Sequence, residues 1–393
     1  MSSILTVNGG SSSLKSALYK VVADQPELHY NFKLSNILAQ PRAQIKDADG
    51  NLITDLKLDF ASIDESGRHQ ACLDFIFAWI NSHAHEHKLS AISHRVVHGG
   101  ERYSQPVEVC DQQLEQLRDY IPLAPLHQPY NLKLIEACHA LLPDVPQVAC
   151  FDTMFHSQMP LEAKQFALPR EMYDEGIRRY GFHGLSYEYI YRQLEQRDCA
   201  QFNTIVGHLG AGASLCAIKD GLSITSTMGF TALDGPPMGT RCGAIDPGVL
   251  LYLMREKAMD VDAIEKLLYK KSGWLGVSGG LTSEMAELLA SDSQQAREAV
   301  NLFCYRVARE IGSLGAALEG IEQLVFTGGV GENSAEIRSL VCQRSRWLGI
   351  EIDDAANRAN AEIISTPGSR VCVRVIATDE EQMLAQHALE VLE

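Results

Sequence analysis

The sequence predicts an α/β protein with two domains, and three observations lead to this prediction. Short apolar runs alternate with longer amphipathic stretches, which is the pattern of helices packed on sheets. The chain has 393 residues, 46% of them apolar and 21% charged, so each of two domains has enough residues to bury its own core. Two strand-then-glycine segments, 5–13 and 206–214, look like one structural device used twice.

Six short apolar runs are predicted to be strands, and two amphipathic stretches are predicted to be helices. Each run ends at a polar or glycine-rich segment, which is where α/β proteins place their ligands. A helix is predicted over 72–87, because Leu73, Ile76 and Ile80 fall on one face. A second helix is predicted over about 293–318. The predicted strands are 4–7, 91–97, 148–151, 204–206, 324–327 and 371–376.

Composition and charge argue against several classes of function. The formal net charge of -16 disfavours a nucleic acid or an anionic membrane as partner, because both need a basic face. No uninterrupted apolar segment approaches the ~20 residues that a membrane-spanning helix needs, so we expect a cytoplasmic protein. The ten cysteines include no Cys-x-x-Cys pair, which predicts reduced cysteines rather than disulfides or a zinc site.

Three glycine-rich loops follow predicted strands, and such loops can bind phosphate. Glycines let backbone N–H groups approach an anion, and hydroxyl groups donate further hydrogen bonds. The first loop, 8–15, includes Asn8 and Lys15 and does not match the P-loop pattern. The others are 208–214 and 326–333. A single loop of this kind could be an ordinary turn. Three of them indicate a nucleotide held by loops from two domains.

Five further polar segments are dense in arginine, histidine and aspartate. Arginine is a planar clamp for a carboxylate or a phosphoryl group. Aspartate at the end of a strand suits Mg²⁺, which binds a few carboxylates and several waters. These segments are 93–101, 124–129, 151–156, 178–184 and 238–243.

Taken in order along the chain, these segments resemble the signature segments of the acetate kinases. The similarity runs from end to end, through 8–15, 94–101, 151–156, 179–184, 228–231, 238–243 and 331–333. It implies an α/β fold of two ribonuclease-H-like domains, as in the acetate and sugar kinase, chaperone-ATPase and actin superfamily. The active site is then expected in the interdomain cleft. The expected domains are 1–153 with a C-terminal return at 381–393, and a nucleotide-binding domain at 154–380. A homodimer is also implied.

The activity that the resemblance implies is reversible phosphoryl transfer from ATP to acetate, giving acetyl phosphate and ADP, with Mg²⁺ or Mn²⁺ as the ion. The carboxylate attacks in line and directly. With a pKa near ~4 it is already ionised at neutral pH, so no general base is required. The difficulty is that an anion attacks a polyanion, so catalysis depends on positioning and on charge stabilisation by arginine, histidine and magnesium.

The resemblance also assigns roles to individual residues. Asn8 and Glu380 would organise the metal, and Arg241 with His183 would stabilise the phosphoryl group in flight. The full catalytic set is Asp152, His183, Arg241 and His127. The residues implied for the carboxylate substrate are Arg95, Val97, Leu126, Phe182 and Ala232. Those implied for nucleotide and phosphate are Ser11, Ser13, Lys15, His208, Gly210, Gly212, Glu284, Gly329, Gly331, Asn333 and Arg338.

Departures from the family pattern leave alternatives open. Ala232 stands where the family usually has proline, which leaves room for an extra methylene and makes propionate an alternative substrate, although Val97 keeps the pocket wall bulky. Ala211 stands where the phosphate loop usually has asparagine. Segment 284–286 lacks the arginine that packs on the base, so a phosphoryl donor other than ATP is a second alternative.

Two alternatives come from other functional classes. An ATPase switch of the actin or chaperone type would keep the nucleotide loops without needing Arg95 and His183. A sugar kinase would need an aspartate base, for which Asp152 is available, but an arginine with an apolar pocket fits a carboxylate better. Separately, the alternating histidines of 83–87 do not share a helical face, so we interpret them as a solvated helix end rather than a metal site.

Overall fold

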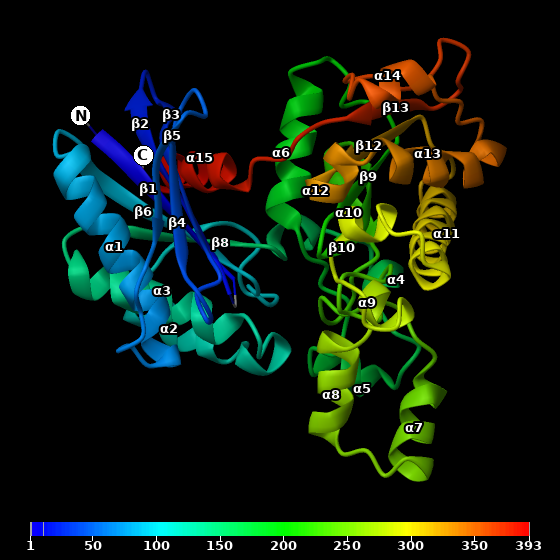
Figure 1. The fold of residues 1–393 in the computed structure, drawn as a ribbon, viewed down its shortest axis with the longest axis horizontal. Helices are drawn as coiled ribbons and strands as arrows, with labels where there is room; N and C mark the ends of the chain where they lie inside the picture. The colour runs from blue at the N-terminus through cyan, green and yellow to red at the C-terminus, as the bar shows by residue number, and fades with distance from the viewer. Residues whose placement is uncertain (1, 11, 393) are drawn as a thin grey trace. The chain divides into compact units, whose positions relative to one another are not determined.

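The computed structural model describes residues 2–10 and 12–392, which form two compact units. Unit 1 comprises the chain up to Met154 together with the segment from Asp379 onward, and unit 2 is Phe155–Thr378. The sequence had placed Met154, Asp379 and Glu380 in the second domain. All three belong to unit 1, and Asp379 and Glu380 do so because the last helix, α15 (Glu380–Leu392), packs on its strands (Figure 1).

Unit 1 is built on one sheet in the strand order β5-β4-β3-β2-β1-β6-β8-β7. Strands β1 to β5 form an antiparallel meander, whereas β6 and β8 run parallel to β1. The strands are β1 (Ser2–Gly9), β2 (Leu14–Val22), β3 (Gln25–Ser35), β4 (Arg42–Asp47), β5 (Leu52–Lys57), β6 (Lys88–Val96), β7 (Val107–Glu108) and β8 (Gln147–Phe151). The other helices of the unit are α1 (Arg68–His83), α2 (Asp111–Arg118) and α3 (Gln128–Leu141).

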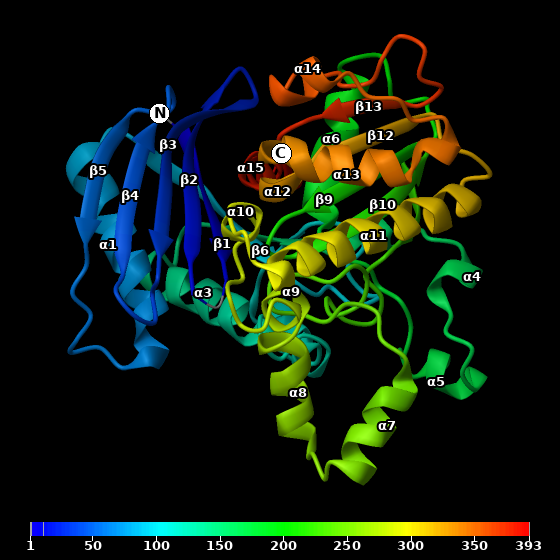
Figure 2. The ribbon, with the colours of Figure 1, turned by 45° about the vertical axis from the view of Figure 1, so that its right-hand side comes forward.

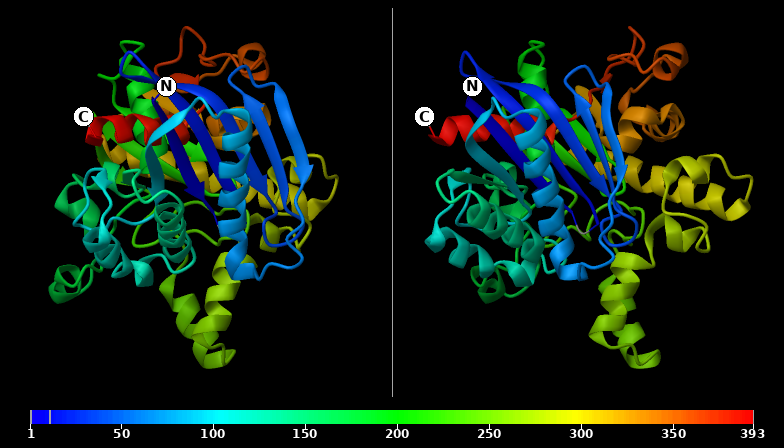
Figure 3. Two further views of the ribbon diagram at one scale, coloured as in Figure 1. Left: turned by 90° about the vertical axis from the view of Figure 1, so that its left-hand side faces the viewer. Right: turned by 60° about the vertical axis from the view of Figure 1, so that its left-hand side comes forward.

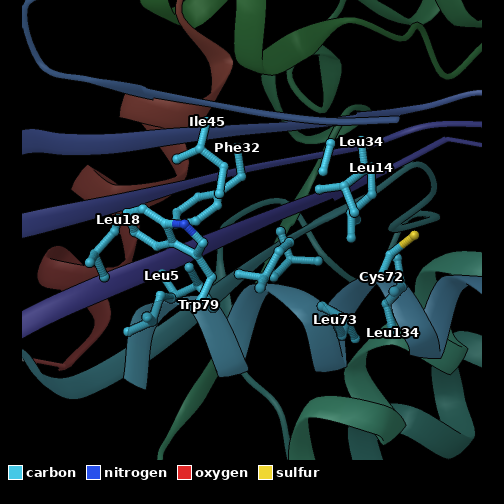
Figure 4. Packing of buried hydrophobic residues seen from close by; sticks show 14 of the residues in the cluster. Leu5, Leu14, Leu18, Phe32, Leu34, Ile45, Cys72, Leu73, Trp79 and Leu134 are labelled. Carbon is cyan, nitrogen blue, oxygen red and sulfur yellow. The ribbon is translucent and has the colours of Figure 1, made fainter. Parts of the chain in front are cut away.

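The core of unit 1 lies between this sheet and helices α1 and α3. One face of α1 buries Cys72, Leu73 and Trp79 against sheet residues such as Leu5 and Phe32, as Figure 4 shows. Helix α15 covers the opposite face of the sheet (Figure 3). Because both faces are covered, the central strand β1 is buried along nearly its whole length.

Unit 2 contains a five-stranded sheet in the order β11-β10-β9-β12-β13. Strands β9, β12 and β13 are parallel, and β10 and β11 are antiparallel neighbours. Helix α6 buries Tyr187 and Ile190 against Val206 and Val325 of this sheet. The long helix α11 lies along β9, β10 and β11 (Figure 2). The strands are β9 (Thr204–Leu209), β10 (Ala213–Lys219), β11 (Leu222–Ser226), β12 (Gln323–Thr327) and β13 (Cys372–Val375).

Eleven α-helices belong to unit 2 among the described residues. They are α4 (Leu161–Lys164), α5 (Arg170–Asp174), α6 (Gly184–Glu195), α7 (Pro247–Glu256), α8 (Val261–Lys270), α9 (Gly273–Val277), α10 (Met285–Leu289), α11 (Gln294–Ala317), α12 (Gly328–Asn333), α13 (Ala335–Arg344) and α14 (Asp354–Arg358). Across the described part of the chain, no helix combines the length and the apolar character that crossing a bilayer would require.

The two sheets share one central pattern. In each, an antiparallel hairpin leads into parallel strands, as β3-β2-β1-β6-β8 in unit 1 and β11-β10-β9-β12-β13 in unit 2. The glycine segments 10–13 and 210–212 both connect the first two strands of their sheets. The structure therefore confirms that one device is used twice.

Each of the six predicted strands is present, β1 among them, but the other strands of the meander, β2 to β5, were missed. Their burial is uneven, as in β3, where exposed and half-buried residues interrupt the apolar ones. The helix predicted over 72–87 is α1, which begins at Arg68 and ends at His83. The interpretation of 83–87 as a solvated helix end was wrong for His87, which lies in the turn before β6 and is buried.

Candidate active-site residues

The C-terminal ends of three parallel strands bring the predicted metal and substrate residues of unit 1 together. Asn8 lies near the end of β1, Arg95 near the end of β6, and Asp152 directly after β8. Helix α15 begins beside them with Glu380 and Glu381. Because neighbouring parallel strands end at the same edge of a sheet, residues distant in the sequence converge here.

Arg95 is the centre of this cluster. Its Nε and Nη2 donate to Oδ1 and Oδ2 of Asp152 at 2.8 and 2.7 Å. Its Nη1 donates to Asn8 Oδ1 at 3.2 Å and lies 3.4 Å from Glu380 Oε2. Burial alone would lower the pKa of Arg95, but the charges of Asp152 and Glu380 outweigh burial and raise it. Arg95 is therefore a fixed cation, and one edge of its guanidinium is already occupied by Asp152.

Glu381 belongs to the cluster and was missed from the sequence. Its Oε1 accepts a hydrogen bond of 3.1 Å from Asn8 Nδ2. Burial raises the pKa of Glu381, and the positive charge of Lys15, which pairs with Asn8 across β1 and β2, acts to lower it. The available signal was the acidic run 379–381 at the start of a helix. That run does not reveal which of its carboxylates faces Asn8.

Two amides on the buried face of α3 hold the strand ends in place. Asn131 accepts from the backbone N–H of Val97 at 3.1 Å and donates to the carbonyl of Gly9 at 3.1 Å. Gln128 accepts from the N–H of His98 at 3.1 Å and donates to its carbonyl at 3.0 Å. These positioning residues were also missed, because an amide on a helix face gives no sign of its partners.

The remaining predicted residues of unit 1 lie on the segments around this edge. Val97 is buried, and Leu126 and His127 are half-buried just before α3. The carbonyl of Ser13 accepts from the N–H of Gly10 in the β1–β2 turn. Ser11 lies outside the described residues.

In unit 2, the rings of His183 and His208 are stacked, and each ring is hydrogen-bonded to a serine. His183 takes the left-handed conformation, with φ of 58°, immediately before α6. Its Nδ1 shares a 2.8 Å hydrogen bond with Ser214 Oγ, and its ring stacks on that of His208 at a centroid distance of 4.3 Å. His208 Nδ1 is bonded in turn to Ser186 Oγ at 2.8 Å. These contacts fix the orientation of the His183 ring.

Arg241 lies beside the same glycine loop as His183. Its Nη1 donates to the backbone carbonyl of Ala232 at 2.6 Å. A Cβ atom placed on Gly212 would lie 3.0 Å from Arg241 Nη2 and 3.5 Å from His183 Nε2. The predicted phosphoryl-stabilising pair therefore converges at the 210–212 loop, and Gly212 leaves the space that both side chains use.

A Gly212→Ala variant is expected to keep its fold and to lose about tenfold or more in kcat, because small displacements of catalytic groups are costly. The added methyl group meets the flexible tip of Arg241, which can move aside, so the loss is in geometry rather than in stability. Steady-state kinetics together with thermal unfolding test this. The matched control is Gly368→Ala, whose Cβ would meet nothing within 4 Å. Equal kcat in the two variants would contradict the prediction.

The third glycine loop, at the start of α12, is held by the half-buried Glu332 and the buried Arg338. Glu332 Oε1 accepts from the backbone N–H groups of Gly328 at 2.8 Å and Thr378 at 3.1 Å. Arg338 is fully buried and donates to the carbonyls of Gly331 and Glu332, both at 2.8 Å, and to Asn357. The resemblance gave Arg338 a role at the nucleotide. Its burial makes it a positioning residue of the loop instead.

Other predicted nucleotide residues are placed near the surface of unit 2. Glu284 is exposed at the start of α10. Asn333 Nδ2 donates to the carbonyl of Gly329 at 2.9 Å, so this side chain closes the short helix α12. Gly210 and Gly329 lie close together, since a Cβ on Gly210 would be 3.8 Å from the Gly329 nitrogen.

Phe182, which was predicted to contact the carboxylate substrate, is buried directly before His183.

Comparison with known proteins identifies the family of this chain. A model of the Acetokinase family matches residues 3–386. The chain belongs to the acetokinase family. This membership confirms the resemblance and makes the chain a kinase.

Individual relatives cover nearly the whole chain. An acetate kinase of Rhodopseudomonas palustris is 48% identical over 391 residues, covering 98% of this chain and 97% of its own. A propionate kinase structure from Francisella tularensis has a TM-score of 0.91 at 36% identity, and an acetate kinase structure from Porphyromonas gingivalis has 0.87 at 35%. Each covers 100% of both chains. These structures confirm the predicted two-domain α/β fold.

Proposed function

We propose that this member of the acetokinase family transfers a phosphoryl group reversibly between ATP and acetate, forming acetyl phosphate and ADP. The observation that carries the proposal is the convergence of Arg241 and His183 at the 210–212 loop. A guanidinium and an imidazole beside a glycine loop suit a transferring phosphoryl group, whose negative charge they would stabilise. The relatives named acetate kinase support acetate as the acceptor.

We further propose that Asn8, Glu380 and Glu381 hold Mg²⁺, with Asp152 next to them. Carboxylate and amide oxygens are the donors that Mg²⁺ prefers, and these three side chains are joined by hydrogen bonds at the edge of the unit 1 sheet. When bound, the ion neutralises phosphate charge. Arg95 holds Asp152 and Glu380 close together, and its remaining donors are suited to an acceptor carboxylate.

Propionate is the second candidate acceptor. The Francisella tularensis structure is named a propionate kinase, and Ala232 offers more room than the proline usual in the family. One methylene changes discrimination by about 1–3 kcal/mol, so both acids are expected to react. A cytoplasmic homodimer also remains part of the proposal. All ten cysteines lie among the described residues and none forms a disulfide, which suits a reducing compartment.

The test is an acyl-hydroxamate assay with purified protein, Mg²⁺ and hydroxylamine. Acetate and propionate are compared as acceptors, and ATP, GTP and pyrophosphate as donors. ATP-dependent hydroxamate formation from acetate supports the proposal. Product formed only with GTP or pyrophosphate would support the proposed phosphoryl transfer but show that ATP is not the donor. Absence of product with every combination would overturn the proposed reaction.

A further inference from the structure

We propose that His29, Glu86 and His87 form a binding site for a divalent transition-metal ion of the zinc type. One ligand atom from each side chain lies within 4.8 Å of the others. The site lies on unit 1 near the beginning of β1, since Ser3 contacts His87. Asn8 is five residues further along the strand, which corresponds to about 16 Å. The acidic cluster at Asn8 is therefore a different site.

A β-bulge in β3 brings His29 to the site. Leu18 pairs with Tyr30 and Tyr19 pairs with Leu28, so His29 is the extra residue of the bulge. Successive side chains of a regular strand point to opposite faces, yet the rings of His29 and Tyr30 lie only 4.1 Å apart. The bulge thus re-aims His29, whose ring centroid lies 4.7 Å from that of His87.

His87 directs a buried ring nitrogen toward the Glu86 carboxylate. Its side chain is completely inaccessible to solvent, and Nδ1 shares a 2.8 Å hydrogen bond with Ser3 Oγ. Nε2 is buried and makes no hydrogen bond among the described residues, although Glu86 Oε1 lies 3.3 Å away. A metal-binding histidine commonly donates its other N–H to an oxygen, which is the role that Ser3 can fill. A metal ion bound to both His87 Nε2 and the Glu86 carboxylate would give this buried nitrogen a partner.

The donor set indicates which metal fits. Two imidazoles and a carboxylate suit zinc and its neighbours among the transition metals, whereas Mg²⁺ and Ca²⁺ prefer oxygen donors only. Zinc bonds of 2.0–2.1 Å place two ligand atoms of a tetrahedron about 3.3 Å apart, which is the observed Glu86–His87 spacing. Glu86 is exposed and His29 half-buried, so both can move the short distance that closes the site. Solvent can supply the fourth ligand.

The charges around the site are compatible with this assignment. Burial, with the nearby Lys20, lowers the pKa of His29, and burial lowers that of His87. Both rings are therefore neutral near pH 7, the form that binds metal. Lys20 is a cation that opposes binding, and the Glu86 carboxylate offsets it.

The experiment titrates the full-length protein, after chelator treatment and dialysis, with ZnCl₂ in a calorimeter. Excess MgCl₂ is present so that the acidic cluster does not compete. One zinc ion is expected to bind the wild type. His29→Ala and Glu86→Gln are each expected to weaken binding by about tenfold or more, as loss of even a supporting contact does at metal sites. Both residues are accessible, so neither variant is expected to unfold.

The matched control is His139→Ala, which removes an exposed histidine of α3 outside the cluster. Its zinc affinity is expected to equal that of the wild type. Zinc should also raise the unfolding temperature of the wild type and of the control, but not that of His29→Ala. Absence of binding to the wild type, or equal affinity in His29→Ala, Glu86→Gln and the control, would overturn the proposal.

Discussion

Replacing Arg241 with alanine is expected to reduce kcat by about 10³–10⁵, by analogy with the arginines that stabilise phosphoryl transfer in other enzymes. Arg241 is fixed by its hydrogen bond to the Ala232 carbonyl, and its Nη2 lies at the Gly212 loop near His183 Nε2. A fixed guanidinium stabilises the developing charge without reorganising during the reaction. Alanine removes that charge and leaves the loop intact.

The measurement is the steady-state rate of acetyl phosphate formation, with ADP binding measured separately by calorimetry. ADP affinity is expected to change much less than kcat, because Arg241 acts on the group being transferred. Arg255→Ala, which removes an exposed arginine of α7 in the same unit, is the control and should keep wild-type kcat. A kcat within tenfold of wild type in the Arg241 variant would show that this arginine does not stabilise the reaction.

The second large effect is expected from Arg95→Leu, which should lower the free energy of unfolding by about 3–5 kcal/mol. The guanidinium is bidentate on Asp152, whose side chain is only 3% exposed, and it also faces Glu380. Without it these carboxylates remain close together and uncompensated. The loss should shrink on acidification, because a protonated carboxyl group no longer needs the cation. Urea denaturation at neutral and acidic pH measures both effects.

A double variant separates the ion pair from packing. Arg95→Leu with Asp152→Leu should cost less than the sum of the two single changes, by a coupling of about 1–3 kcal/mol. The matched control is Arg42→Leu, which breaks a pair with Asp55 of the same bidentate geometry. Arg42 is 51% exposed, so its replacement should lower the free energy of unfolding much less than that of Arg95. If Arg95→Leu and Arg42→Leu lowered the free energy of unfolding equally, burial of the ion pair would not be the cause of the large loss expected for Arg95→Leu.

Much of the candidate site could be predicted because it lies at the ends of strands. Asn8 and Asp152 follow apolar runs that the sequence marks clearly, Arg95 lies near the end of another, and parallel strands then bring these ends together. The glycine loops were equally visible, since each interrupts an apolar run. The repeated strand-then-glycine segment was predicted on the same grounds, and both copies are present in the two sheets.

The sequence by itself determined the α/β class, the loops and the residue types available for phosphoryl chemistry. Only the tertiary structure decided which partners these residues have. Arg95 is bidentate on Asp152, Arg338 is buried beneath the α12 loop, and Glu381 faces Asn8. The bulge that turns His29 toward His87 was equally hidden. The physical reason is that the spacing of apolar residues along the chain identifies a helix or a strand. Side-chain contacts depend instead on strand register and on packing between residues far apart in the chain.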